Sequence, residues 1–126
     1  MSNATQTFRG KASPDLSGIE FLKKFIGTTT PGSEVTIISY TVPANTQVNL
    51  LQLNITCNTS GVFKVFLDSD QVGSGRTGAA AKNVLFTWPP FKKVDAAVVV
   101  AVKYESEAHT PATEIEAYLQ GREIAL

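Results

Sequence analysis

The amino-acid sequence predicts an all-β protein: a β-sandwich or jelly roll of seven or eight antiparallel strands, preceded by an N-terminal extended arm and a short helix. Apolar and polar residues alternate over short segments after residue 33, which is the period of a strand with one buried face. Clusters of Gly, Pro, Asn and Asp separate these segments, as in sandwiches and barrels. Helical patterns do not alternate with the strands, so a parallel sheet is not expected.

Length and charge narrow the class further. A chain of 126 residues argues for one domain, which we divide into an arm and helix (1–33) and a sandwich (34–126). The formal net charge is zero, so no field directs the protein to nucleic acid or to a membrane surface, and neither is an expected partner. Charged residues make up 17%, against about 25% in an average domain. This low content predicts that a partner protein covers part of the exterior.

Residues 1–12 form the predicted arm. They show no sustained periodicity, and Phe8 is their one large apolar side chain after Met1. Such a segment has little to bury on its own domain. We expect it to become ordered against a neighbouring chain, with Phe8 and Arg9 as interface residues.

A short helix is predicted over Pro14–Ile26. Ser13 can cap it, and Leu16, Ile19 and Leu22 recur at helical spacing. Two alternatives follow for its apolar stripe. It packs on the domain's own sheet, or it docks on a neighbour, in which case Leu16 and Ile19 are interface residues.

The remainder of the chain has the pattern of strands and turns. The predicted strands are Glu34–Val42, Val48–Cys57, Val62–Asp68, Gln71–Gly73, Lys82–Trp88, Val94–Tyr104 and Thr113–Glu123. Their inward side chains are predicted from the alternation: Leu51, Leu53, Ile55, Phe63, Val65, Leu67, Val84, Phe86, Trp88, Ile115, Ala117 and Leu119. Cys57 shares the inward parity and is expected to be a buried thiol. Residues 73–81 are small and predict a flexible loop, with Arg76 as an anchor for a partner.

The residues that could carry catalysis or bind a metal are few. His109 is the only histidine, and its neighbours Ser106 and Glu107 lie on the same loop, where adjacent residues rarely converge as a triad. Paired histidines are absent and Cys57 is the only cysteine, so no zinc site is expected. The acidic pair Glu114 and Glu116 falls on the outer face of the last strand, without an aromatic cleft for a glycosidase.

Two short motifs have a simpler structural interpretation. Asp68-Ser69-Asp70 begins like a calcium loop but lacks its Gly and its distal Glu, so a hairpin turn is predicted. Residues 73–78 match G-x-G-x-x-G, but a dinucleotide site needs a parallel strand before the motif and a helix after it. We therefore expect no catalytic residue, no cofactor and no metal.

A series of turn and strand signals between residues 40 and 124 resembles the small jelly-roll modules of tailed-bacteriophage virions. These signals are Val42-Pro43-Ala44-Asn45, Gly61-Val62-Phe63-Lys64-Val65 with Asp68, Val72-Gly73 with Arg76-Thr77, Phe86-Thr87-Trp88-Pro89, and Leu119-Gln120-Gly121-Arg122-Glu123. The resemblance implies a capsid cement or decoration protein, made in the host cytoplasm and located in the virion. Its partners would be the major capsid protein or other virion proteins, and its role would be to bind and stabilise neighbouring shell subunits.

A second function stays open at this point. Jelly rolls of fibres and baseplates also recognise carbohydrate or a receptor, which requires exposed aromatic side chains. The candidates for that role are Tyr40, Trp88, Phe91 and Tyr104.

Self-association is expected as well. Residues 96–102 are apolar on both faces of their predicted strand, which requires a cover on both sides. Either the helix or another subunit supplies the second cover, and Val99 is then an interface residue. Together with the low charge and the frequent trimers among the similar phage modules, this predicts a homotrimer.

Overall fold

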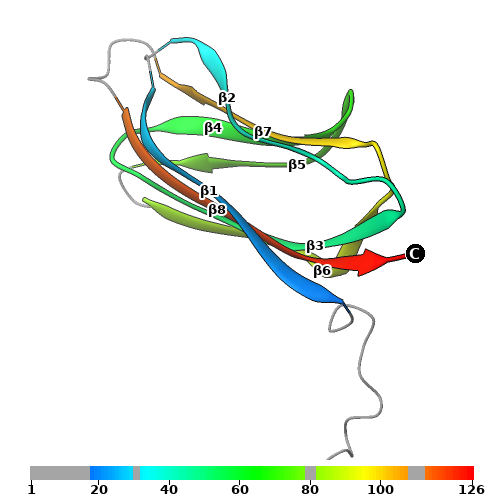
Figure 1. Ribbon diagram of the computed structural model, residues 1–126. Coiled ribbons are helices and arrows are strands. Elements are labelled where there is room, and N and C mark those ends of the chain that lie inside the picture. The colour runs from blue at the N-terminus through cyan, green and yellow to red at the C-terminus, as the bar shows by residue number, and fades with distance from the viewer. Residues whose placement is uncertain (1–17, 30–31, 79–81, 108–112) are drawn as a thin grey trace, which may run out of the picture.

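The computed structural model describes residues 18–29, 32–78, 82–107 and 113–126. Within them the chain forms eight strands, namely β1 (Ile19–Thr29), β2 (Glu34–Thr41), β3 (Thr46–Cys57), β4 (Gly61–Leu67), β5 (Asp70–Thr77), β6 (Asn83–Val94), β7 (Val99–Ser106) and β8 (Thr113–Ala125). They build two four-stranded antiparallel sheets that pack face to face (Figure 1). The predicted all-β sandwich is confirmed, and it has eight strands where the sequence indicated seven or eight.

The strand order follows one simple rule. Sheet A has the order β1-β8-β3-β6 and sheet B the order β2-β7-β4-β5. The first strand thus pairs with the eighth, the second with the seventh, the third with the sixth and the fourth with the fifth. The chain is arranged as one long hairpin, rolled up so that its two arms alternate between the sheets, with the turn after β4 as its tip (Figure 1).

The core lies between the two sheets and follows the predicted alternation. Seven side chains expected to point inward are fully buried or nearly so: Leu53, Ile55, Phe63, Val65, Ile115, Ala117 and Leu119. Cys57 is buried among them, as expected. Leu67, Val84 and Phe86 pack only partly against the core. Leu51 is half-buried because the register of β3 shifts between Leu50 and Gln52, which breaks the alternation there.

An aromatic contact closes the sandwich between β5 and β6. The Trp88 indole nitrogen donates a hydrogen bond to the Val72 carbonyl oxygen at 3.0 Å. Val72 can accept it because the pairing of β4 with β5 skips this residue, passing from Gly73 to Gln71. Phe86 stands edge-on to Trp88 with ring centroids 5.0 Å apart. The buried indole therefore joins the edge strands of the two sheets.

The opposite side, between β1 and β2, is closed by a more polar contact. The Tyr40 hydroxyl of β2 donates to the Glu123 carboxylate of β8. The Phe21 ring lies 5.2 Å from the Tyr40 ring, and the Lys23 ammonium stands 4.8 Å above the centre of that ring. Lys23 points inward from an edge strand, which is one way in which sheets protect their edges.

The predicted helix over Pro14–Ile26 is wrong for its described part. Residues 19–26 lie in β1, which pairs with β8 without interruption from Ile19 to Thr29. The β1 side chains alternate, with Phe21 and Phe25 half-buried and the even-numbered residues around them exposed. The helical spacing was misleading because the strand's partner lies at the other end of the sequence. Residues 19–29 are accordingly part of the sandwich rather than of a separate N-terminal segment.

Three other boundaries differ from the sequence-based expectation. Residues 73–77 belong to β5 rather than to a loop. Strand β6 continues through Pro89 and Pro90, which is possible because its pairing with β3 skips residues 88–91. Strand β7 begins at Val99, since residues 96 and 97 form a turn in which Ala97 has a positive φ of 70°. The described residues contain no helix with the length and apolar character needed to cross a membrane.

Candidate functional site

The most buried polar cluster of the described chain is structural. The Cys57 sulfur lies 3.0 Å from the Thr77 hydroxyl and 3.1 Å from the Tyr104 hydroxyl, and those two hydroxyls are 2.8 Å apart. All three side chains are buried. Burial, and next the hydrogen bond to Cys57, raise the pKa of Tyr104. The cluster joins β3, β5 and β7 across both sheets and lies out of reach of a substrate.

The residues considered for catalysis are not assembled into a site within the described chain. His109 lies outside the described residues. Ser106 is buried whereas Glu107 is exposed, and Glu114 and Glu116 are both exposed on sheet A. In the described ranges no three His, Cys, Asp or Glu side chains could share a metal ion.

The Asp68-Ser69 turn has the role that the sequence predicts. Asp68 has a positive φ of 54°. Its carboxylate accepts a hydrogen bond from the Val99 amide at 3.0 Å, and its own amide donates to the Val99 carbonyl oxygen at 2.8 Å. The aspartate therefore fixes the hairpin tip to the start of β7, which is the turn chemistry expected of it.

The outward side of sheet A, called here the A face, is broad, and the middle of its strands carries few charges. Its central side chains come from all four strands, and the register arranges them in rows: Leu22, Gln120, Gln52 and Thr87; Lys24, Tyr118, Asn54 and Leu85; Ile26, Glu116, Thr56 and Asn83. Of these, only Lys24 and Glu116 are charged. Leu22, Ile26 and Leu85 are 48%, 61% and 54% exposed. The three apolar side chains stand on the two edge strands, β1 and β6, and the mostly uncharged polar side chains of β8 and β3 lie between them. Depletion of charge is a property of the central part of protein interfaces.

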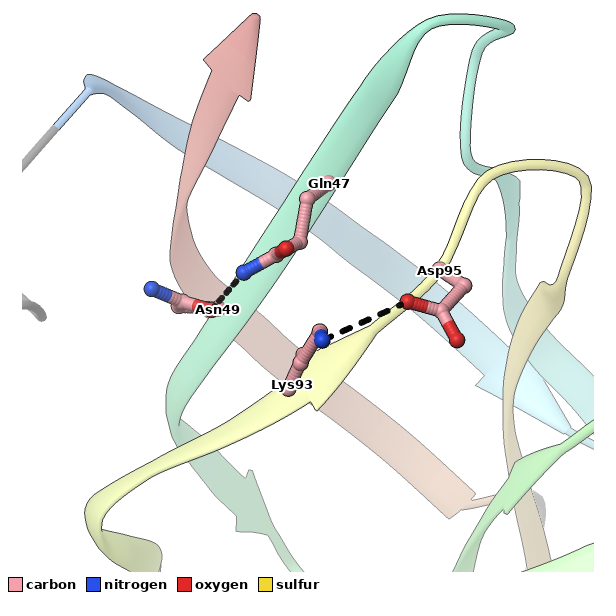
Figure 2. A network of polar contacts seen from close by, with 4 residues as sticks. All are labelled: Gln47, Asn49, Lys93 and Asp95. Atoms are coloured by element: carbon pink, nitrogen blue, oxygen red, sulfur yellow. Dashed lines mark hydrogen bonds and ion pairs between the residues drawn. The ribbon is translucent and has the colours of Figure 1, made fainter. Parts of the chain in front are cut away.

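Polar groups border the A face at both ends. At one end a hollow of about 480 Å³ lies between Ile26, Lys82 and the carboxylates of Glu114 and Glu116. At the other end, Figure 2 shows Gln47 donating to the Asn49 side-chain oxygen at 3.2 Å, beside an ion pair at 4.0 Å between Lys93 and Asp95. The arrangement of a weakly charged centre inside a polar rim matches the anatomy of protein interfaces.

The outward side of sheet B, called the B face, carries charged side chains in neighbouring rows. Glu34, Glu105, Val62 and Arg76 lie in one row across it. The Lys64 ammonium is 3.7 Å from a Glu34 carboxylate oxygen. A hollow of about 350 Å³ is lined by these charged residues. Exposed ion pairs contribute little binding energy, so the B face is the weaker candidate for docking.

The residues predicted for the protein interface are not brought together. Phe8, Arg9 and Leu16 lie outside the described residues. Ile19 is 75% exposed at the start of β1. Arg76 is exposed on β5, and Val99 is half-buried at the start of β7, near the other end of sheet B. The interface role of these residues stays a prediction.

The exposed apolar side chains of the A face were missed by the sequence-based prediction. In β1, Leu22 and Ile26 have the opposite parity to Phe21 and Phe25, so a strand pattern would place them outward. The helical interpretation concealed that signal. In β6, Leu85 lies between the inward Val84 and Phe86, and its outward position follows from the same alternation.

The aromatic side chains expected of a recognition module are largely enclosed. Tyr104 is fully buried and Trp88 is 9% exposed. Tyr40 and Phe91 are half-buried, and Tyr40 is engaged with Glu123 between the sheets. Tyr104 and Trp88 therefore offer no free ring face of the kind on which sugars stack.

The fold and the surfaces define the class of the protein as an all-β, two-sheet sandwich. Comparisons with protein-family models, with curated proteins and with solved structures found no match. The functional argument therefore rests on the strand order and on the chemistry of the A face.

Proposed function

We propose that this chain is a structural protein of a tailed-bacteriophage virion, a jelly-roll module of the capsid cement or decoration type. The strand order supports the jelly-roll assignment, since each strand of the first half pairs with its counterpart in reverse order in the second half. Jelly rolls of eight strands are common in viral shells. The module acts by binding the major capsid protein or another virion protein and bracing neighbouring shell subunits.

The proposal rests on the composition of the A face. Leu22, Ile26 and Leu85 give it three exposed apolar side chains. The side-chain amides of Gln52 and Gln120, which lie between them, are hydrogen-bonded to each other at 2.5 Å. A shell surface that covers this weakly charged area would exclude water from it, while the polar rim stays hydrated.

The test is a shell-binding experiment with purified protein and empty shells of the virus that encodes it. The protein is added to shells that lack it, and both the bound fraction and the temperature at which the shells open are measured. The wild-type protein should bind and raise the opening temperature. Leu85→Lys should bind at least about tenfold more weakly, because a charge would then be buried in the interface.

The matched control is Ser74→Lys on the B face. Ser74 is exposed on β5, so this change adds the same charge to the other sheet and should leave binding unchanged. Thermal melting of each variant alone verifies that the sandwich is folded. Binding of Leu85→Lys at the wild-type level, or loss of binding by Ser74→Lys alone, would refute the A face as the docking surface.

The homotrimer stays a prediction, with less support than the sequence suggested. Its main premise was a strand apolar on both faces over residues 96–102, but residues 96 and 97 form a turn. Outward from β7, Val99 and Ala101 are followed by Lys103 and Glu105. The Lys103 ammonium stands 4.9 Å above the centre of the Phe66 ring, so the chain's own side chains cover much of this face.

A further inference from the structure

The four edge strands of the sandwich differ in how well they are protected against pairing. Strand β6 contains Pro89 and Pro90. The pairing of β2 shifts between Thr36 and Ile38, and that of β5 skips Val72. Prolines and bulges of this kind prevent a sheet edge from accepting another strand.

Strand β1 has neither a proline nor a bulge, and its protection is limited to the inward-pointing Lys23, which lies over the Tyr40 ring of its own chain. Its register with β8 is unbroken over all 11 residues from Ile19 to Thr29, and it contains no proline. Within the described chain it has a neighbouring strand on one side only. Strand β1 also carries three of the five large hydrophobic side chains that are exposed in the described residues, namely Ile19, Leu22 and Ile26. A long, regular and apolar edge is the part of a sandwich best suited to accept a further strand.

The charges of β1 are complementary when two copies of the strand run antiparallel. When two copies run antiparallel with Leu22 opposite Leu22, Glu20 of each copy stands opposite Lys24 of the other. All these side chains are outward on the A face, where opposite charges directly across a strand pair attract each other. We propose that β1 is a self-association edge, and that two copies of this chain pair through it about a two-fold axis at Leu22.

The inward side chains fit the same register. Ile19, which is 75% exposed in one chain, stands opposite Phe25 of the second copy. Phe21 stands opposite Lys23, an aromatic ring opposite a cation. Sliding the pair by one step toward the C-terminus places Lys23 against Lys23, and by two steps Lys24 against Lys24, both of which are repulsive. Sliding it one step the other way, with Phe21 opposite Phe21, brings no like charges together but loses both Glu20–Lys24 pairs. The charges of β1 thus favour the register with Leu22 opposite Leu22.

Pairing through β1 joins two copies of sheet A into one continuous sheet of eight strands. The two-fold axis lies perpendicular to the sheet, because the paired residues keep their outward parity. Both A faces then form one surface on the same side. This inference stands on the edge strand itself and does not depend on the virion role proposed above.

The test measures the mass of the full chain by analytical ultracentrifugation between about 1 and 100 µM, a range of about two decades around typical weak-dimer affinities. Wild-type protein should sediment as a dimer, at twice the 13.5 kDa of one chain. Glu20→Lys and Lys24→Glu should each weaken the dimer about tenfold or more, because each places like charges opposite one another at two symmetric positions.

An equimolar mixture of the two variants should restore the dimer. The Glu20→Lys chain has lysine at both positions 20 and 24, and the Lys24→Glu chain has glutamate at both. In the mixed dimer each lysine therefore stands opposite a glutamate. The double variant carrying both changes should likewise dimerise with itself. Lys92→Glu, on the protected edge strand β6, is the matched control and should leave the mass unchanged. Thermal melting verifies that each variant is folded.

Three outcomes would overturn the inference. They are a single-chain mass for wild type at every concentration, a trimer mass, or a dimer that both single variants leave intact. Loss of the dimer in the single variants without rescue on mixing would overturn the proposed register. None of these outcomes bears on shell binding by Leu85→Lys, so failure of one proposal is distinguishable from failure of the other.

Discussion

The Tyr40 hydroxyl on β2 donates a hydrogen bond to the Glu123 carboxylate on β8, and this bond connects the two sheets beside the open edge of β1. The residues are 83 positions apart in the sequence. On the other side of the sandwich, Trp88 makes the corresponding connection to Val72. Each sheet is thus fixed to the other along both of its sides, and the A face is held as a stable platform.

Removing the Tyr40 hydroxyl should weaken the first connection. Tyr40→Phe keeps the ring that contacts Phe21 and Lys23 and removes only the donor to Glu123. We expect the free energy of unfolding to fall by about 1 kcal/mol, since the carboxylate can still be partly hydrated. Urea unfolding measures the change. Tyr118→Phe, whose hydroxyl bonds Glu116 on the exposed A face at 2.9 Å, is the control and should change stability less.

The stability of the fold should decrease in alkaline solution. Burial, followed by the hydrogen bond to Glu123, raises the pKa of Tyr40 above its ordinary value of 10.0. Burial does the same for the pKa of Tyr104. A raised pKa means that the folded state holds the proton more tightly than the unfolded state, so this stabilisation is complete below about pH 10 and is lost progressively above it.

Urea unfolding at a series of pH values from about 8 to 11.5 measures this loss. Because Tyr40→Phe has one fewer such group, its stability should decrease less steeply above about pH 10 than that of the wild type. Parallel curves for the two proteins would contradict the assignment of the effect to Tyr40.

Trp88 should be the most sensitive position of the β5–β6 side. It is the only tryptophan in the chain and is 9% exposed. Trp88→Ala removes both the buried ring and the hydrogen bond to Val72, which should cost about 3–5 kcal/mol of unfolding free energy. Leu85→Ala, at a 54% exposed position of the same strand, should cost under about 0.5 kcal/mol.

Native fluorescence of Trp88 should be blue-shifted and move to longer wavelength on unfolding. An emission maximum typical of water in the native protein would contradict the assignment.

The sequence predicts the central strands well because their burial is decided locally. Over residues 53–57 of β3 and 115–119 of β8, every second side chain enters the core, as at Leu53, Ile55 and Leu119. A strand with one buried face shows this period in its own residues, whatever its partner. The sandwich class followed from several such segments separated by turns.

The N-terminal strand could not be recognised in the same way. In β1, Phe21 and Phe25 face inward while Leu22 and Ile26 are exposed, so apolar residues occupy both parities and imitate a helix. What makes this segment a strand is the pairing of Ile19 with Glu123 and of Thr29 with Thr113. That partner is distant in the sequence, and local propensity is overridden by it.

The glycine-rich stretch of β5 was misjudged for a different reason. Gly73 and Gly75 suggested a flexible loop, but each lies beneath an aromatic ring. A Cβ on Gly73 would come within 2.8 Å of the Phe86 ring, and one on Gly75 would clash with Phe63. Glycine in this strand therefore makes room for core side chains. Only the folded structure shows which rings occupy that space.

The sequence predicted the chemical character of the candidate surface but not its position. Low charge content indicated a covered exterior, and the A face has that character. Its position was not predictable, because Leu22, Tyr118 and Leu85 come to share one face only through the pairing of the strands of sheet A. Arg76 and Val99 were chosen from local sequence, and they lie on the other sheet.

Gly61 should tolerate no side chain, because it lies against the buried polar cluster. A Cβ there would be 2.7 Å from the Glu105 carbonyl oxygen and would also clash with the Tyr104 hydroxyl. The backbone cannot move away easily, since Gly61 pairs with both Thr77 and Ser106. We expect Gly61→Ala to lower the free energy of unfolding by about 1–3 kcal/mol through overpacking. Gly78→Ala is the matched control, because its Cβ would lie at an ordinary 3.6 Å from the Ser60 hydroxyl, and it should be neutral or slightly stabilising. Urea unfolding of both variants gives the comparison, and equal stabilities would show that β4 and β7 can separate enough to admit a methyl group.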